Sequence, residues 1–440
     1  MYHIHGDVIT NLTLQNTSVR FSSKIDGKWG YLIIRKGYFM IKKVKKMLIS
    51  FYCILIFACF GGCAGIKIRG IDTPDVTVIP QMENVSIIQS MGFSPNGRQV
   101  ISGSRDGTIH LWDIRAGQKI KSFYGHSGGV SFVAFSPNRR QVFSAGTWDG
   151  KIRVWNTMTG EELRSFYGHS SLVSSTALSP CGGQIFLGYT DGTAKIWDME
   201  SGSEIRSFCI YYDTITSAAF SYDGNQVLIS SMDGSLRLWD IETGNEISRL
   251  KQPHERSPFW NTFSVAFSPN GMQALSSTSG YIFLWDTGIG QKIKRFRPDH
   301  RNVPFITFTP NGKQAITGSM GAGEGFTLWS IETGEGLKTF YGHSRWVGKV
   351  TFSPCGRHIL SNSGDSTMRL WNMRTGQEIA QFISFPDDEW VVITPDGFYT
   401  ASANGDKHLL VQAEEKNYVI DEFRAALHRP RVVSRRLSGR

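Results

Sequence analysis

The 440-residue sequence contains no apolar run long enough to span a membrane comfortably. Its longest uncharged apolar stretch, Met47 to Phe60, has fourteen residues, whereas a transmembrane helix needs about 20. A basic stretch over residues 42–46 precedes this run, and Gly61-Gly62-Cys63 follows it. A basic segment, an apolar segment and small residues in this order are typical of a secretory signal. We therefore predict a removed signal peptide over residues 40–63, with a retained anchor as the lesser alternative.

Cysteine is also scarce, and its spacing excludes the common metal frameworks. None of the six cysteines forms a CxxC pair, so the sequence predicts no zinc site of that kind. Cys181 and Cys355 occupy the same Ser-Pro-Cys-Gly turn in two different repeats, and we expect both to stay unpaired. The full set is Cys53, Cys59, Cys63, Cys181, Cys209 and Cys355.

Cys63 follows small residues and resembles the lipidated cysteine of the bacterial lipoprotein cleavage box. The segment Phe60-Gly61-Gly62-Cys63 fits that box at its two glycines and departs from it at Phe60, where a smaller aliphatic residue is usual. The resemblance implies lipidation of Cys63, with Cys59 as a poorer candidate. The alternative is a plain secretory signal.

Residues 1–39 precede the expected signal and show no sustained helical or strand period. Because a signal should begin at the N-terminus, we expect Met40 to be the true start and residues 1–39 to be an upstream extension. The leader predicts an extracytoplasmic protein of a bacterium, either a membrane-anchored lipoprotein or periplasmic. The alternative is a cytoplasmic protein, if the leader is not processed.

Positive charge is concentrated at the two ends of the chain. The formal net charge is +10, but residues 1–69 carry +9, residues 416–440 carry +5 and residues 70–415 carry −4. A slightly acidic central region lacks the broad positive surface on which phosphate binding depends. We therefore expect no nucleic-acid partner.

The central region is built from internal repeats. A motif that ends in an apolar residue, Trp and usually Asp or Asn recurs seven times, at spacings of 42 to 46 residues. A period in the low forties predicts four strands per unit. An Asp-Gly turn precedes several of the Trp strands and is a strong hairpin signal. The tryptophans are Trp112, Trp155, Trp197, Trp239, Trp285, Trp329 and Trp371.

These features resemble the WD-repeat family over residues 85–384. The family's Gly-His dipeptide stands at Gly125-His126, Gly168-His169 and Gly342-His343, each within a phrase Ser/Thr-Phe-Tyr-Gly-His-Ser. The resemblance implies an all-β propeller of four-stranded antiparallel blades. We predict seven blades, with eight as the alternative, and a linker with a closing strand over residues 64–84.

The resemblance also implies a structural role for histidine. In this family the His, the turn Asp, a strand Ser or Thr and the Trp form a buried hydrogen-bonded set, which we call the blade lock. We expect locks from His126, Asp149 and Trp155, from His169, Asp191 and Trp197, and from His343, Asp365 and Trp371. Because the pair recurs in several blades, a catalytic His/Asp role is disfavoured.

Loops that break the regular repeat are candidates for partner binding, since a rigid scaffold holds loops without needing their side chains for packing. One contains Phe259 and Trp260. The others lie at the turns of the fifth and sixth units, with Tyr281 and Glu324. Drift in a tolerant surface loop is the alternative.

The sequence beyond the seventh repeat has two parts. Residues 385–415 resemble part of a further repeat without its Trp-Asp ending, so we expect a degenerate eighth repeat or an extension. Residues 416–440 form a basic tail, for which a frayed terminus is the simplest expectation. A similar segment occurs in bacterial proteins that join a WD propeller to a caspase-like peptidase, but no cysteine follows Cys355.

The sequence therefore predicts a non-catalytic scaffold that binds proteins and is tethered to a membrane through its N-terminal lipid. It contains no recognisable catalytic, cofactor or metal site, and we expect a monomeric propeller. The alternative is a regulatory or substrate-presenting part of a caspase-like peptidase system, including a truncated fusion.

Overall fold

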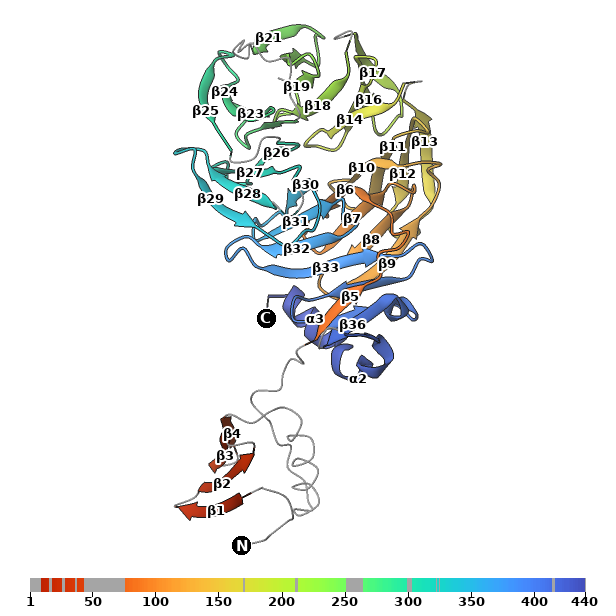
Figure 1. Cartoon of the computed structure of the whole chain (residues 1–440). Helices are drawn as coiled ribbons and strands as arrows, with labels where there is room; N and C mark the ends of the chain where they lie inside the picture. The colour runs from red at the N-terminus through yellow and green to blue at the C-terminus, as the bar shows by residue number, and fades with distance from the viewer. Residues whose placement is uncertain are drawn as a thin grey trace. The chain divides into compact units, whose positions relative to one another are not determined.

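The computed structural model describes residues 9–15, 18–25, 28–35, 38–42, 76–168, 171–209, 213–250, 264–298, 303–321, 323, 325–413 and 416–439. The chain divides into two units, Met1–Val76 and Thr77–Arg440. Figure 1 shows the elements of both units.

The first unit contains a four-stranded antiparallel sheet in sequence order. Its strands are β1 (Ile9–Gln15), β2 (Ser18–Ile25), β3 (Lys28–Arg35) and β4 (Tyr38–Lys42). The expectation that residues 1–39 have no strand period was wrong, because three of these strands and the start of the fourth lie there. Asp26-Gly27, which stands between two of the strands in the sequence, is a hairpin signal that marks them. Whether translation begins at Met40 stays a prediction.

The second unit contains seven consecutive antiparallel sheets, the blades, of which the first six have four strands and the seventh begins with four strands of the same kind. Blade one is β6 (Ile88–Phe93), β7 (Gln99–Ser104), β8 (Ile109–Asp113) and β9 (Gln118–Phe123); blade two is β10 (Val130–Phe135), β11 (Gln141–Gly146), β12 (Lys151–Asn156) and β13 (Glu162–Tyr167); blade three is β14 (Val173–Leu178), β15 (Gln184–Tyr189), β16 (Thr193–Asp198) and β17 (Glu204–Cys209). Blade four is β18 (Ile215–Phe220), β19 (Gln226–Ser231), β20 (Leu236–Asp240) and β21 (Glu246–Leu250); blade five is β22 (Ser264–Phe267), β23 (Gln273–Ser277), β24 (Ile282–Asp286) and β25 (Lys292–Phe296). Blade six is β26 (Ile306–Phe308), β27 (Gln314–Gly318), β28 (Phe326–Ser330) and β29 (Gly336–Phe340); blade seven is β30 (Val347–Phe352), β31 (His358–Ser363), β32 (Met368–Asn372) and β33 (Glu378–Ser384).

The blades form a closed ring, as predicted for a β-propeller (Figure 1). The first strand of each blade contacts the next blade around the ring, and β30 of blade seven contacts β6 of blade one. Among the described strands, the four of each blade are consecutive in the sequence, so blades one and seven share no strand from opposite ends of the chain. The contact between blades one and seven must therefore be secured in another way.

The burial pattern of the strands explains why the repeats fold in this way. The second strand of each blade is buried at nearly every position, because both of its faces pack against neighbouring blades. The outermost strand alternates more exposed and more buried residues, as in β13 and β17. Hydrophobic clusters accordingly span adjacent blades.

The segment after blade seven secures the ring. β34 (Trp390–Ile393) pairs with β33, and β35 (Tyr399–Ala401) pairs with β34, so the sheet of blade seven has six strands. The helix α3 (Pro430–Leu437) buries Val433 and Leu437 in one cluster with Trp112 of blade one and Phe382 of blade seven. The tail that we expected to be frayed is thus packed against the junction of the first and last blades.

The expected closing strand takes part in a separate small sheet. β5 (Thr77–Pro80) pairs with β36 (Leu409–Ala413), which pairs in turn with β37 (Lys416–Val419). The strand that we expected within residues 64–84 thus pairs with the C-terminal segment and not with blade one or blade seven.

Candidate functional site

Blades two and seven contain the complete hydrogen-bonded lock. His126 Nδ1 lies 2.7 Å from Asp149 Oδ2, and its Nε2 lies 2.7 Å from Ser144 Oγ. The Trp155 indole donates to the same Ser144 Oγ at 2.8 Å. Blade two therefore joins all three predicted lock residues through one serine.

Blade seven repeats this geometry. His343 Nδ1 lies 2.9 Å from Asp365 Oδ2, His343 Nε2 lies 2.8 Å from Ser361 Oγ, and Trp371 donates to Ser361 Oγ at 2.8 Å. Burial lowers the pKa of His343, so the imidazole is neutral. A neutral ring donates from Nδ1 to the carboxylate and accepts the Ser361 hydroxyl hydrogen at Nε2.

The carboxylate of this lock is held in its charged form. Burial by itself would raise the pKa of Asp365, but hydrogen bonds from His343 and Thr367 outweigh burial and hold that pKa well below its usual range. The lock thus forms a directional chain of hydrogen bonds from indole to serine, imidazole and carboxylate. Such a chain orders a blade and leaves no proton in need of an acceptor.

Blade three departs from the predicted lock. Leu187 holds the strand position that Ser144 holds in blade two, so Trp197 has no serine or threonine hydroxyl opposite it. His169 lies outside the described residues, and Asp191 accepts from Ser171 and Thr193. Blade four likewise has Ile229 at the hydroxyl position. Packing of apolar side chains takes the place of the hydroxyl in blade four, whereas in blade three the Tyr189 hydroxyl interacts with the Trp197 side chain.

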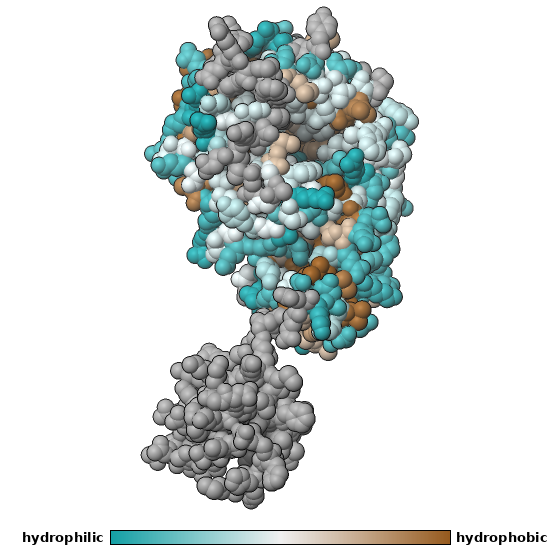
Figure 2. All heavy atoms as spheres, in the orientation of Figure 1, coloured by the Kyte–Doolittle hydropathy of each residue, from teal (hydrophilic) through white to brown (hydrophobic). Residues whose placement is uncertain are grey.

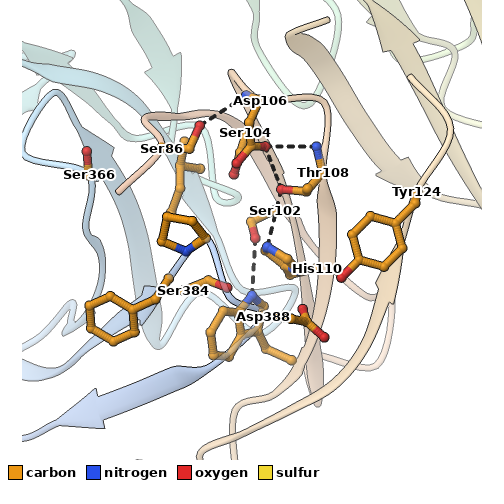
Figure 3. Close-up of a pocket in the computed structure, with 14 residues that line it drawn as sticks. Ser86, Ser102, Ser104, Asp106, Thr108, His110, Tyr124, Ser366, Ser384 and Asp388 are labelled. Carbon is orange, nitrogen blue, oxygen red and sulfur yellow. Dashed lines mark hydrogen bonds between the residues drawn. The ribbon is translucent and has the colours of Figure 1, made fainter. Parts of the chain in front are cut away.

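Blade one has a lock from which the imidazole is missing. Trp112 donates to Ser102 Oγ at 3.1 Å, and Asp106 stands at the turn position of Asp149. Asn84, which stands where the count from the repeat places a histidine, is exposed and has a φ of 60°. A pocket of about 40 Å³ lies at this place, lined by Ser102, Ser104, Asp106, Thr108, His110, Trp112, Tyr124 and Asp388, among others (Figure 3).

A chain of polar contacts forms one side of this pocket. The Thr108 hydroxyl lies 2.6 Å from Asp106 Oδ1 and 3.3 Å from His110 Nε2. His110 Nδ1 lies 3.0 Å from Ser122 Oγ, and Ser122 donates to Asp388 at 2.7 Å. Because the Ser122 hydrogen is used in this way, Ser122 accepts from His110 Nδ1–H. Burial, followed by the nearby Lys119 charge, lowers the pKa of His110 to about 4.

The loops predicted to bind partners are only partly described. Phe259, Trp260 and Glu324 lie outside the described residues. Tyr281 is half-buried, with the Arg295 guanidinium 4.7 Å from its ring centre. Tyr281 therefore packs on its own blade and offers little free aromatic surface.

A set of exposed aromatic side chains lies at one end of the ring. We did not predict this set from the repeat pattern. In antiparallel blades, the loops between blades and the turns between second and third strands share one end, which we call the lock face. Tyr124, Tyr167 and Tyr341 lie there with exposed fractions of 59%, 68% and 67%. Trp148 and Trp346 lie at the same end with 58% and 41% exposed.

The Ser/Thr-Phe-Tyr-Gly-His-Ser phrase contains the signal for the three tyrosines. Phe123 and Phe340 are each 1% exposed, and the following residue of a strand points to the opposite face. The tyrosine after each phenylalanine therefore faces solvent. Figure 2 shows hydrophobic side chains as separate patches on the face in view, and tyrosine and tryptophan are pale on its hydropathy scale.

The remaining predictions concern the signal peptide, the cysteines, membrane-spanning helices and metal sites. Cys63 and the rest of the expected signal lie outside the described ranges. Cys181 and Cys355 are free thiols. Over the part of the chain that is described, no helix has the length and hydrophobicity to span a membrane, and no group of metal-ligating side chains is found.

Comparison with known families agrees with this geometry. The model for "WD domain, G-beta repeat" matches residues 82–113, 117–156, 160–198, 202–240, 254–286 and 334–372, which together make up half of the chain. The chain belongs to the WD-repeat family. The family model does not match residues 287–333, so the sixth blade, around Trp329, is recognised by the sequence repeat and by its four-stranded sheet.

Individual WD-repeat relatives resemble only short segments. The chain is 40% identical over 50 residues to the U3 snoRNP-associated protein-like YAOH of Oryza sativa subsp. japonica, covering 11% of this chain and 10% of that protein. It is 36% identical over 76 residues to WD repeat-containing protein 82 of Drosophila melanogaster, covering 17% and 24%. With guanine nucleotide-binding protein subunit beta-5b of Danio rerio the identity is 34% over 55 residues, covering 12% and 14%. The matches thus span less than a quarter of these relatives.

Proposed function

We propose that this WD-repeat protein is a non-catalytic scaffold that binds protein partners on its lock face. The observation that carries the proposal is the exposure of Tyr124, Tyr167 and Tyr341 at that end of a closed ring. Tyrosine and tryptophan supply rigid contact area and a polar group at low entropic cost, and they are enriched at binding hot spots. Three copies of one phrase present three such side chains from a rigid frame.

The closed ring of blades supports a role in presenting these side chains to a partner. The blades are closed on one another by buried strands, so exposed loop residues contribute little to packing. Burying one exposed tyrosine against a partner removes apolar area from water, worth about 25 cal/mol per Å² before the costs of association. Several aromatic anchors on one rigid face therefore suit a protein partner.

We further propose that the scaffold is monomeric and works outside the cytoplasm of a bacterium, tethered by a lipid on Cys63. The basic, apolar and small-residue order of residues 42–63 supports this location. Mass spectrometry of the mature N-terminus tests it: an acylated Cys63 supports tethering, whereas an intact Met1 on a soluble protein contradicts it.

Site-specific photo-cross-linking tests the binding face. A photoreactive residue at position 167 or 341 should give a discrete cross-linked product with a partner in the native host. The matched control is position 222, because Tyr222 is 69% exposed but lies in the turn between the first and second strands, at the opposite end of the ring. Equal cross-linking from position 222, or none from positions 167 and 341, would contradict the proposal.

Replacing Tyr124, Tyr167 and Tyr341 together by Ser should remove the cross-linked partner and leave the melting temperature nearly unchanged, because exposed side chains contribute little to stability. Recovery of a caspase-like peptidase as the partner would instead support the regulatory or substrate-presenting role in a peptidase system.

A further inference from the structure

Blades one and seven have matching lock positions except for the histidine. Ser102, Ser104, Asp106, Thr108 and Trp112 of blade one correspond to Ser361, Ser363, Asp365, Thr367 and Trp371 of blade seven. In blade seven the His343 ring fills the space between serine and carboxylate. In blade one a pocket of about 40 Å³ lies beside the corresponding Ser102 and Asp106, and it is lined by His110, whose ring lies edge-on to Trp112 at 6.3 Å between ring centres.

The empty lock leaves hydrogen-bonding capacity unused. Ser102 is 1% exposed and accepts from Trp112, yet its hydroxyl hydrogen has no acceptor among the described residues. The Asp106 Oδ1 atom accepts from Thr108, whereas Oδ2, the atom equivalent to the one that binds His343 in blade seven, has no donor within the same set of residues. A buried donor and a carboxylate thus face one small space, as in a complete lock without its ligand.

The pocket is small and opens at one side. One water molecule requires about 10–15 Å³ of such volume, so 40 Å³ holds two or three waters, and a ring that enters the pocket must extend through its open side. Asp106 and Tyr124 at its rim are exposed, whereas Ser102, His110 and Trp112 are buried (Figure 3). The pocket therefore opens on the lock face.

The chemistry of the pocket selects among side chains. Ser102 offers a hydrogen and Asp106 needs one, so the ligand must accept at one atom and donate at another. Lysine and arginine have no acceptor, and a carboxylate would be repelled by Asp106 and Asp388. Amide and hydroxyl side chains and a neutral imidazole can each do both. The imidazole is the group that takes this position in blades two and seven, edge-on to the tryptophan at 6.3 and 6.1 Å between ring centres.

We propose that blade one binds a histidine side chain of a partner protein, whose imidazole completes the lock between Ser102 and Asp106. This inference rests on the proposed function, since the pocket opens beside the exposed aromatic side chains of the lock face. Tyr124 lines the pocket and belongs to that aromatic set. The partner's histidine would thus bind to a site that is formed by residues of the propeller's own repeat.

Two probes test the pocket directly in the full-length protein: imidazole and histidine blocked at both ends as N-acetyl-histidine methylamide. Each is titrated while the indole N–H resonance of Trp112, identified with Trp112→Phe, is followed by NMR. We expect a saturable shift with both probes and at least tenfold weaker binding in Asp106→Asn, which keeps the shape of the turn but loses the charge. Ser102→Ala should weaken binding as well.

A matched control comes from blade seven. His343→Gly empties the complete lock, and the probes should then shift the Trp371 resonance and raise the melting temperature of that variant. If imidazole restores the His343→Gly lock but leaves Trp112 unmoved in the wild type, the blade-one pocket is not an imidazole site. No saturable shift at Trp112 overturns the proposal whatever the variant does.

Further outcomes separate the sources of the ring. Binding of imidazole without the blocked histidine would show a site for small molecules and overturn the assignment to a polypeptide. If the cross-link from position 167 persists in Asp106→Asn and the Trp112 resonance does not shift with either probe, the scaffold proposal is kept. Only the histidine-binding inference is then wrong.

Discussion

Lys119 Nζ donates to Asp388 Oδ1 at 2.5 Å and so joins blade one to the turn that follows blade seven. The equivalent position is Glu162 in blade two and Glu378 in blade seven, where it pairs with Arg153 and Arg369. Blade one therefore reverses the charge at this position and takes its anion from the C-terminal extension. This pairing ties the extension to the junction where the ring closes.

Asp388→Ala should lower the free energy of unfolding by about 1–2 kcal/mol. Burial lowers the pKa of Lys119, whose side chain is 5% exposed, and the variant would remove its carboxylate partner and leave only neutral acceptors, the carbonyl of residue 388 and the Ser384 hydroxyl. Asp387→Ala is the control, because its pair with His408 is far more exposed and is expected to contribute less than about 0.5 kcal/mol. Urea unfolding compares the two, and equal losses would mean that Asp388 has no special role in closure.

Leu437→Ala should loosen the junction of blades one and seven. Leu437 is 3% exposed in the cluster that contains Trp112 and Phe382, and loss of its side chain should cost about 2–3 kcal/mol. Hydrogen exchange should then rise in α3 and at the edge of blade one. Arg435→Ala, at an exposed position of the same helix, is expected to change neither. Unaltered exchange in Leu437→Ala would show that the helix does not seal the ring.

The repeat made most of the fold predictable. Each Trp marks a third strand that pairs with a small-residue strand, so a period in the low forties was enough to place four strands per blade. The closure was not predictable in this way, because residues 385–440 no longer repeat. Their packing depends on contacts between segments far apart in the sequence, such as that of Ser434 with the carbonyl of Arg115.

The candidate site shows a similar limit. The resemblance that the Gly-His and Asp-Gly signals carry implied that His126 and His343 bind Asp149 and Asp365. The pocket in blade one was visible in the sequence only as Asn84 at a histidine position. Asp388 and His110 line the pocket because of tertiary packing. A periodic sequence pattern does not predict such packing.

Ser144→Ala should destabilise more than Ser276→Ala, although both serines are fully buried. Ser144 bridges the Trp155 indole and His126, so its removal leaves two buried ring nitrogens unsatisfied. Ser276 accepts from Trp285, and Ser276→Ala should cost about 1–2 kcal/mol against roughly 2–4 kcal/mol for Ser144→Ala. Thermal unfolding measures both, and equal costs would mean that the imidazole adds nothing to the lock.

His110 should make stability depend on pH below neutrality. Burial lowers its pKa to about 4, below the ordinary value of 6.5, so the folded state keeps the ring neutral while the unfolded state takes up a proton. The unfolded state therefore binds more protons between about pH 6.5 and 4, and the free energy of unfolding falls as pH falls, by about 3 kcal/mol in total across this window. His110→Gln should flatten the decline between pH 7 and 5, measured by urea unfolding. A wild-type slope in His110→Gln would show that other groups carry the dependence.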